Sequence, residues 1–223
     1  KALACDSQSA FGGIIACNRT IDAELAQQII SKQFVEVIIA PSLSSSAKEI
    51  LANKPNCRIL ELAAHTANHN LIYSIDGGLL LQSNNNEPLD TTTWKNVSTK
   101  TATDTELTDL KFAWQSVKHV KSNAIVIVKN KSTIGIGSGQ PSRLDSCKIA
   151  SSKALQYVPE KIISSVAASD AFFPFPDGVQ ELIKVGVKAI IQPGGSINDK
   201  KVIEAANKAK IVMAFTDTRH FKH

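Results

Sequence analysis

The residue types and spacings that could support chemistry lie at the ends of predicted strands. The first is the glycine-rich string IGIGSGQPSR, residues 134–143, which leaves a strand and enters a helix. Backbone amides and the helix N-terminus there attract an anion, and Arg143 can bind a phosphate or carboxylate through two parallel hydrogen bonds. The string matches neither a Walker loop nor a dinucleotide-binding fingerprint. Tight packing of the glycines in a hairpin is the alternative explanation.

A second candidate is the aromatic loop, SDAFFPFPDG at residues 169–178. Its prolines cannot continue a strand ladder, so the sequence predicts a loop at the carboxyl end of a strand. Phe172 and its neighbours then either line a pocket for a planar ring or belong to the core.

Further candidates lie at other turns. The turn PGGS, residues 193–196, either binds a ligand or caps the helix that starts at Asn198, whereas Ser42 is expected only to cap a helix. Asn123 precedes a strand and either orients a polar ligand or forms a turn. Arg219 follows the last strand. His220 and His223 have no third ligand at metal-binding spacing and are interpreted as ordinary tail residues.

The elements that position these residues show an internal repeat. Residues 34–62 and 185–215 each contain a strand (37–40; 189–191), a turn with proline and serine, a helix (46–52; 198–209) and a strand (58–62; 211–215). This is the βαβ pattern with strands buried on both faces. Upstream, SAFGG at 9–13 precedes a helix at 22–31, and DAFFP at 170–174 precedes a helix at 178–185. The sequence therefore predicts two α/β units built on one plan.

The second unit has more sequence in front of it than the first. A helix at 104–120, a hairpin of strands 124–128 and 133–137, and a helix at 142–157 are predicted there. The first unit would need the same elements before Lys1, yet the chain begins within a predicted helix at 1–5. We therefore expect a fragment that lacks the front half of its first unit. Residues 63–103 connect the units and include one strand pair around 71–82.

Composition narrows the class of protein. The chain has 223 residues, 43% hydrophobic and 20% charged, which is typical of globular proteins of one or two domains. Four cysteines without metal or disulfide spacing are expected to be reduced and mostly buried. The net charge of +5 is spread along the chain, which favours small anionic ligands over nucleic acid. Without a signal peptide or an apolar run of membrane length, we expect a cytoplasmic protein that makes no membrane contact.

Seven strings together resemble the formyltransferase part of the bifunctional AICAR formyltransferase/IMP cyclohydrolase family, where AICAR is aminoimidazole carboxamide ribotide. In chain order they are SAFGGIIA (9–16), IISKQFVEVIIAP (29–41), VKSNAIV (120–126), IGIGSGQPSR (134–143), ASDAFFPF (168–175), IQPGGS (191–196) and FTDTRHFKH (215–223).

The resemblance implies a fold of two cytidine-deaminase-like α/β units with mixed sheets flanked by helices. Residues 1–62 would form a partial first unit truncated at its N-terminal side, 63–103 a connecting segment, and 104–223 a complete second unit. The zinc motifs of true deaminases are missing, so no metal is expected.

The resemblance also implies a set of substrate-binding residues. They are Gly12, Glu36, Asn123, Arg143, Leu144, Phe172, Asp177, Ser196, Ile197 and Arg219, with Leu144 placed against the folate. The implied small-molecule partners are AICAR and the cosubstrate 10-formyltetrahydrofolate, and the implied assembly is a homodimer.

The implied reaction is purine-biosynthetic formyl transfer to the 5-amine of AICAR. This amine is a poor nucleophile, so a general base and an oxyanion-stabilising cation are needed. The family takes both from a KHxNPxG string, which does not occur in this chain. Lys129 and Asn130 are the repeat counterpart, without the histidine. We therefore expect no general base here, with Asn123 as an orienting residue. Pro141 and Pro176 depart from the family pattern. A non-catalytic nucleotide- or folate-binding module is the alternative.

Overall fold

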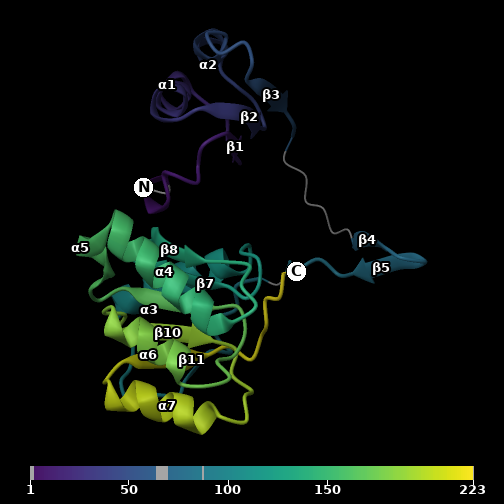
Figure 1. Cartoon of the computed structure of the whole chain (residues 1–223). Coiled ribbons are helices and arrows are strands. Elements are labelled where there is room, and N and C mark those ends of the chain that lie inside the picture. Colours follow the sequence, from purple (N-terminus) through teal and green to yellow (C-terminus); the bar gives the residue numbers. More distant parts are fainter. Residues whose placement is uncertain (1–2, 64–69, 87, 223) are drawn as a thin grey trace. The chain divides into compact units, whose positions relative to one another are not determined.

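The computed structural model describes residues 3–63, 70–86 and 88–222. The chain divides into two compact units (Figure 1). The larger unit combines Lys1–Asp6 with Asn85–His223, and the smaller unit is Ser7–Asn84. The division at residues 62 and 103 that the family resemblance implies stays a prediction.

The larger unit is built on a six-stranded mixed sheet with the order β6-β11-β10-β9-β7-β8. Strands β9, β10 and β11 run parallel, whereas β7 pairs antiparallel with both β9 and β8, and β6 pairs antiparallel with β11. The strand bounds are β6 Lys95–Asn96, β7 Ile125–Val128, β8 Thr133–Gly137, β9 Val166–Ser169, β10 Ala189–Gln192 and β11 Val212–Phe215.

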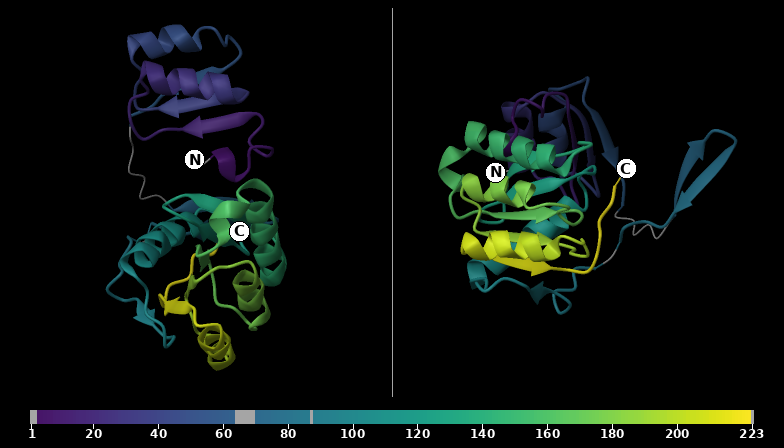
Figure 2. Two further views of the ribbon diagram at one scale, coloured as in Figure 1. Left: turned by 90° about the vertical axis from the view of Figure 1, so that its left-hand side faces the viewer. Right: turned by 60° about the horizontal axis from the view of Figure 1, so that its bottom comes forward.

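Helices cover both faces of this sheet (Figure 2). Helix α3 (Asp104–Val117) packs on one face, while α4 (Arg143–Tyr157), α6 (Asp177–Lys184) and α7 (Asp199–Lys208) pack on the other. Successive strand residues alternate between the two cores because side chains along a strand point to opposite faces. On β7, for example, Ile125 and Ile127 face α4, whereas Val126 and Val128 face α3. The sequence pattern of a buried α/β sheet is thereby confirmed.

Two glycines of β8 bring α4 unusually close to the sheet. A Cβ added at Gly135 would lie 2.1 Å from the backbone oxygen of Ala150, and one at Gly137 would lie 1.9 Å from that of Ser146. No side chain fits at either distance. These two glycines of the string 134–143 therefore serve packing, but against α4 and not within the hairpin that the alternative explanation named.

The smaller unit contains a three-stranded sheet with the order β1-β2-β3, in which all pairs are parallel. Helices α1 and α2 pack against it around one core. The bounds are β1 Gly13–Ala16, α1 Ala23–Lys32, β2 Val35–Ala40, α2 Ser45–Leu51 and β3 Arg58–Glu61. The expected mixed sheet is therefore found in the larger unit, whereas this sheet is purely parallel.

The internal repeat is visible as topology. The order β1-α1-β2-α2-β3 in the smaller unit matches β9-α6-β10-α7-β11 in the larger one, with three adjacent parallel strands in each. One predicted correspondence is wrong. The string at 9–13 precedes β1, whereas the string at 170–174 follows β9, so the two stand at opposite ends of equivalent strands. The Ala-Phe pair that both strings contain therefore does not mark equivalent positions.

Several element boundaries differ from the predicted ones. The predicted N-terminal helix is a short 3-10 turn, η1 (Leu3–Cys5), and α3 ends at Val117 rather than at residue 120. Ser42 does not cap α2, because Ser44 accepts the hydrogen bond from the Ala47 amide at 3.1 Å. The four-residue α5 (Pro159–Ile162) and the edge strand β6 were not predicted. All four cysteines are free, but only Cys5 and Cys147 are buried.

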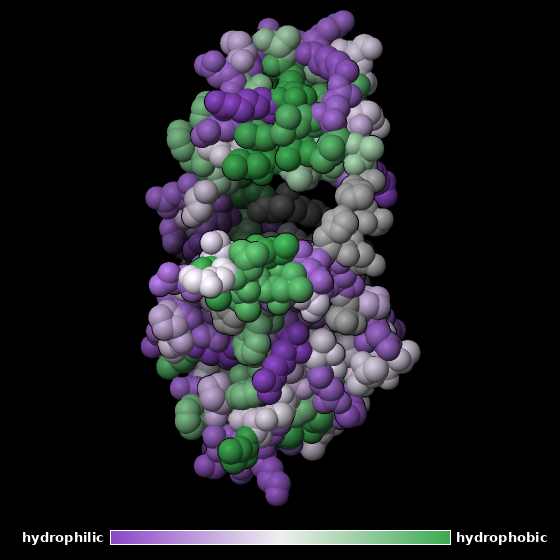
Figure 3. All heavy atoms as spheres, turned by 90° about the vertical axis from the view of Figure 1, so that its right-hand side faces the viewer, coloured by the Kyte–Doolittle hydropathy of each residue, from purple (hydrophilic) through white to green (hydrophobic). Residues whose placement is uncertain are grey.

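The predicted strand pair around residues 71–82 is confirmed as the hairpin of β4 (Leu71–Ile75) and β5 (Gly78–Gln82). Ile72 lies opposite Leu81 and Tyr73 lies opposite Leu80, so each face of the hairpin carries apolar side chains. Figure 3 shows several groups of green apolar side chains exposed at the surface. The large exposed ones on the hairpin are Leu71, Ile72, Tyr73, Ile75, Leu79, Leu80 and Leu81.

Candidate functional site

A cavity of about 520 Å³ lies in the larger unit, where β9 ends and α4 begins. Six of the residues implied by the resemblance line it: Asn123, Arg143, Leu144, Phe172, Asp177 and Arg219. The remaining lining residues are Pro141, Ser142, Ala171, Phe173, Pro174, Phe175, Gly178 and Phe221. Residues separated by about a hundred positions in the sequence are thus gathered at one end of the sheet.

One wall of the cavity is an aromatic ring covered by an arginine. The guanidinium carbon of Arg219 lies 4.9 Å from the centre of the Phe172 ring. At this distance the cation is attracted by the negative face of the ring. Arg219 remains exposed and Phe172 partly exposed, so both can meet a ligand. The pair provides a flat apolar surface beside a positive charge.

The rest of the aromatic loop is held by burial of one ring and by hydrogen bonds to Gln192 and Asn198. Phe173 is only 1% exposed and belongs to the core, whereas Phe175 is 58% exposed. The Phe173 amide donates to Oε1 of the buried Gln192 at 2.8 Å, and Asn198 Nδ2 donates to the Pro174 oxygen at 2.8 Å. The loop therefore contributes Phe173 to the core, while Phe172 and Phe175 line the cavity.

Arg143 lies buried beneath the cavity and is bonded within the protein. Its Nη1 donates to Ser169 Oγ at 2.7 Å and to the carboxylate of Asp170, which has no exposed surface. Its Nη2 donates to Asn123 Oδ1 at 2.7 Å. A buried ion pair keeps its charges only when such hydrogen bonds satisfy them, so this arginine is held in a fixed position.

Asn123 bridges the arginine and the loop that precedes α4. Its amide nitrogen donates to the backbone oxygens of Gln140 and Pro141 at 2.9 and 3.0 Å, while its amide oxygen accepts from Arg143. Ser142, Arg143 and Leu144 at the start of the 15-residue α4 line the cavity, so the positive end of that helix faces it. The predicted attraction for an anion thus has a structural basis at α4, close to Pro141.

Burial sets the charge of two neighbouring groups. Burial raises the pKa of the Cys147 thiol to about 12, so this thiol is neutral at neutral pH. The pKa of His220 is lowered to about 4, mainly by burial and secondly by the positive charge of Lys118. His220 is 3% exposed, its ring centre lies 4.5 Å from that of Trp114, and its Nδ1 lies 3.1 Å from Asn85 Oδ1. It is therefore a buried residue and not an ordinary tail residue, while His223 lies outside the described residues.

The other four implied residues do not line this cavity. Gly12 and Glu36 lie in the smaller unit, where a Cβ on Gly12, at φ +72°, would stand 3.0 Å from Glu36 Oε1. The exposed rings of Phe11 and Phe34 stack beside them with centroids 5.4 Å apart. Gly12 and Glu36 are thus neighbours in space, although they lie 24 positions apart in the sequence.

Ser196 and Ile197 lie in the loop between β10 and α7. Ser196 Oγ accepts from the Asn198 amide at 3.1 Å, and Ile197 is fully exposed. The helix that follows starts at Asp199 with Asn198 as its N-cap, so Ser196 is not the cap. A Cβ on Gly195 would lie 4.0 Å from Arg219 Nη2, which places this loop beside the cavity's arginine.

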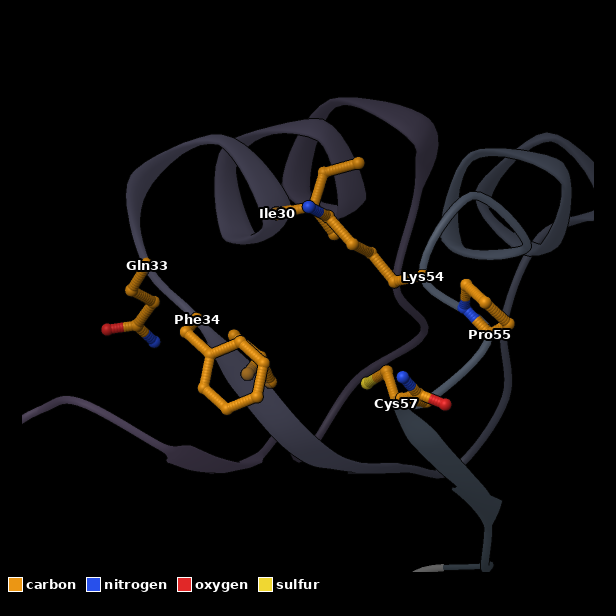
Figure 4. Close-up of a pocket in the computed structure, with 8 residues that line it drawn as sticks. Ile30, Gln33, Phe34, Lys54, Pro55 and Cys57 are labelled. Carbon is orange, nitrogen blue, oxygen red and sulfur yellow. The ribbon is translucent and has the colours of Figure 1, made fainter.

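A second cavity, of about 140 Å³, lies in the smaller unit (Figure 4). It is lined by Ile30, Gln33, Phe34, Val35, Lys54, Pro55, Asn56 and Cys57. Figure 4 shows the Lys54 side chain extending toward Ile30. None of the residues implied by the resemblance lines this cavity.

The described residues contain neither a metal-binding cluster nor a membrane-spanning helix. Among them no group of three or more histidine, cysteine, aspartate or glutamate side chains is placed to hold a metal ion. Within the same residues, no helix has the length and apolar character needed to cross a membrane.

Several residues of the site were missed from the sequence. Asp170, Ser169 and Gln192 support the cavity from within, and Phe221 lines it. A polar residue that ends an apolar strand was the available signal for Ser169 and Gln192, since a buried polar side chain must find a partner. No sequence pattern shows that Ser122 donates to Asp170 at 2.5 Å.

Comparison with known proteins identifies the family. Residues 1–153 match the sequence model of the AICARFT/IMPCHase bienzyme family. The whole chain is 49% identical to the bifunctional purine biosynthesis protein PurH of Bradyrhizobium diazoefficiens, of which it covers 44%. The chain thus spans less than half the length of this relative. With both matches extending over most or all of its residues, the chain belongs to the AICARFT/IMPCHase bienzyme family.

Proposed function

We propose that this chain forms the substrate-binding part of a purine-biosynthesis enzyme that transfers a formyl group from 10-formyltetrahydrofolate to the 5-amine of AICAR. The observation that carries the proposal is the cavity in the larger unit, because six of the ten residues implied by the resemblance line it. The name of the 49% identical relative, a bifunctional purine biosynthesis protein, and the family description, AICARFT/IMPCHase bienzyme, support the same assignment.

The roles of the lining residues follow from their chemistry. Phe172 offers a face on which a heterocycle stacks, and Arg219 supplies the exposed cation for a phosphate or carboxylate. Arg143 is already bonded to Asp170, so we assign it to shaping the cavity and adding positive potential, not to gripping a ligand with both nitrogens. Leu144 supplies an apolar contact for the folate.

Gly12, Glu36, Ser196 and Ile197 complete the proposed binding set. The positive φ of Gly12 and its closeness to Glu36 support a tight turn at a binding surface, since a residue with a Cβ would be strained at φ +72°. Asp177 begins α6, and its Oδ1 accepts from the Gly178 amide at 2.7 Å. Pro176 is the N-cap of that helix, which makes it a structural residue of the loop.

The general base is proposed to come from outside these 223 residues, because the chain has no KHxNPxG string. Formyl transfer needs a group to accept the amine proton, and the described residues that line the cavity include no lysine or histidine for this role. Assembly as a homodimer is proposed as well. The exposed apolar hairpin supports this assembly, because large apolar patches mark interaction surfaces.

Binding of AICAR by isothermal titration calorimetry tests the substrate assignment. The Arg219→Ala variant should weaken AICAR binding about tenfold or more, since it removes a charge-assisted contact. Arg58→Ala, which removes an exposed arginine from β3 in the smaller unit, is the matched control and should bind like the wild type. Equal affinity of the Arg219→Ala variant and the wild type would contradict the assignment.

Tetrahydrofolate release from 10-formyltetrahydrofolate tests the catalytic part. The chain alone should show no turnover, and adding the upstream segment of the 49% identical relative should restore it. Robust turnover by the chain alone would refute the placement of the base outside it. Binding of AICAR with no turnover even after the addition would favour the alternative, a non-catalytic nucleotide- or folate-binding module.

A further inference from the structure

The buried residue Asp170 is bonded both to Arg143 and to the chain segment that carries Arg219. Asp170 Oδ1 accepts from Arg143 Nη1, and Oδ2 accepts from Ser122 Oγ at 2.5 Å. The backbone oxygen of Asp170 accepts from the His220 amide at 2.9 Å. The same residue therefore contacts the buried arginine and the C-terminal segment, which we define as residues 216–222.

Ser122 connects to that segment a second time. Its hydroxyl, which donates to Asp170, also accepts from the Lys222 amide at 3.0 Å, and its own amide donates to the Lys222 oxygen at 2.8 Å. A hydroxyl carries one hydrogen and two lone pairs, so donating and accepting at once is chemically satisfied. Ser122 is 9% exposed and does not line the cavity.

The anchored residues alternate with cavity residues along the C-terminal segment. His220 and Lys222 are bonded to Asp170 and Ser122, while Arg219 and Phe221 line the cavity. Fixing the backbone at His220 and Lys222 restricts where the adjacent side chains of Arg219 and Phe221 can lie. Preorganisation of this kind lowers the entropy lost when a ligand binds.

We propose that Ser122 is a positioning residue of the candidate site, which orients Arg143 through Asp170 and holds Arg219 and Phe221 through its bonds to Lys222. The nature of the ligand rests on the proposed function, whereas the positioning role rests on the hydrogen bonds alone. Without the hydroxyl, Asp170 Oδ2 would lose a donor in a site closed to water, and the Lys222 amide would lose its acceptor.

The first measurement is amide hydrogen exchange, followed by nuclear magnetic resonance. The Lys222 amide should be protected in the wild type, and Ser122→Ala should speed its exchange about tenfold, because opening of the segment no longer breaks that bond. Ser122→Thr keeps the hydroxyl and should preserve the protection. Exchange of the wild-type Lys222 amide at the rate of an unstructured peptide would overturn the proposal without any variant.

The second measurement is AICAR affinity by calorimetry in the same variants. Ser122→Ala should weaken binding about tenfold, and Ser122→Thr should recover most of the loss. Ser116→Ala is the matched control, since the Ser116 hydroxyl donates to the Phe112 oxygen at 2.8 Å within α3, away from the cavity. A loss of less than about twofold in Ser122→Ala, or an equal loss in Ser116→Ala, would overturn the positioning role. Failure of the wild type to bind AICAR would refute the proposed function instead, and the Lys222 exchange would still decide whether Ser122 holds the segment.

Discussion

At the residue scale, residues that line the cavity are held in place by buried polar side chains beneath it. Arg143 and Asp170 form an ion pair with 7% and 0% side-chain exposure, and such pairs are costly unless every polar atom finds a partner. Ser122, Ser169 and Asn123 supply these partners. Two of the lining residues that the resemblance implies, Asn123 and Arg143, therefore belong to a larger network of buried polar groups.

His220 should make the stability of the larger unit depend on pH. Its folded pKa is about 4 because of burial and the charge of Lys118, compared with about 6.5 when unfolded. Between pH 4 and pH 6.5 the unfolded chain therefore binds a proton at His220 more readily than the folded chain does. The contribution of His220 to the free energy of unfolding is complete above about pH 6.5 and is lost as the pH falls toward about 4. Chemical denaturation should show a loss of about 1–2 kcal/mol at pH 5 relative to pH 7.5.

The matched variant for this test is His220→Gln, which cannot titrate in the range. Its loss between the two pH values should be smaller than that of the wild type. The same loss in both proteins would assign the pH dependence to other groups, such as His119, whose pKa is also lowered by burial.

A methyl group added at Gly137 should destabilise the larger unit. Its Cβ would lie 1.9 Å from the Ser146 oxygen, so α4 would have to move away from β8. We expect Gly137→Ala to cost at least about 3 kcal/mol of unfolding free energy, measured by urea denaturation. Gly139→Ala, at φ +67° with its nearest contact at 3.9 Å, should cost only the backbone strain of about 1–2 kcal/mol. Equal losses would contradict a packing role for Gly137.

At the element scale, the sequence predicted most helices and strands because their signals are local. Each parallel strand is a short apolar run followed by a helix with a polar start, as in β10 and α7. What failed depended on distant contacts. The two-residue β6 forms a strand only because β11 offers its free edge. Likewise, the sequence predicts the repeat, but the strings at 9–13 and 170–174, which share an Ala-Phe pair, lie at opposite ends of the equivalent strands β1 and β9.

The start of α3 is specified by a capping box, which gives a test at this scale. Thr103 Oγ1 accepts from the Glu106 amide at 3.2 Å, and Glu106 Oε2 accepts from the Thr103 amide at 2.9 Å. Thr103→Ala should therefore lower the unfolding free energy by about 1 kcal/mol. Thr103→Ser keeps the hydroxyl and should stay near the wild type in the same urea titration. If the serine variant lost as much as the alanine variant, the cap would not be the cause.

At the scale of the whole molecule, several residues named from the sequence meet at one cavity, in an arrangement that the sequence does not reveal. Asn123, Arg143, Phe172 and Arg219 were named together, and they line one cavity. The bond between Arg143 and Asp170 depends on the three-dimensional meeting of α4 with the end of β9, which no local pattern encodes. The resemblance, and not residue chemistry alone, added Glu36, which lies beside Gly12 in the smaller unit.

The apolar hairpin should drive self-association of the chain. Leu79 and Leu81 lie on one face of β5 with 71% and 62% exposure. Sedimentation velocity should show the wild type heavier than a monomer, and the double variant Leu79→Lys, Leu81→Lys should shift it to monomer, because charged side chains oppose burial. Leu155→Lys, which alters a 48% exposed leucine of α4, is the control and should associate like the wild type. A wild type that stays monomeric would contradict this prediction.

The bonds between Ser122 and Lys222 have a practical consequence for anyone who purifies this protein. Lys222 holds two of these hydrogen bonds, and Arg219 and Phe221 lie just before it. An affinity tag fused after residue 223 would begin directly beside Lys222. Its bulk and charge could then disturb these hydrogen bonds and, through them, Arg219 and Phe221 in the cavity. A cleavable tag at the N-terminus avoids this interference, so affinity measurements should use material prepared in that way.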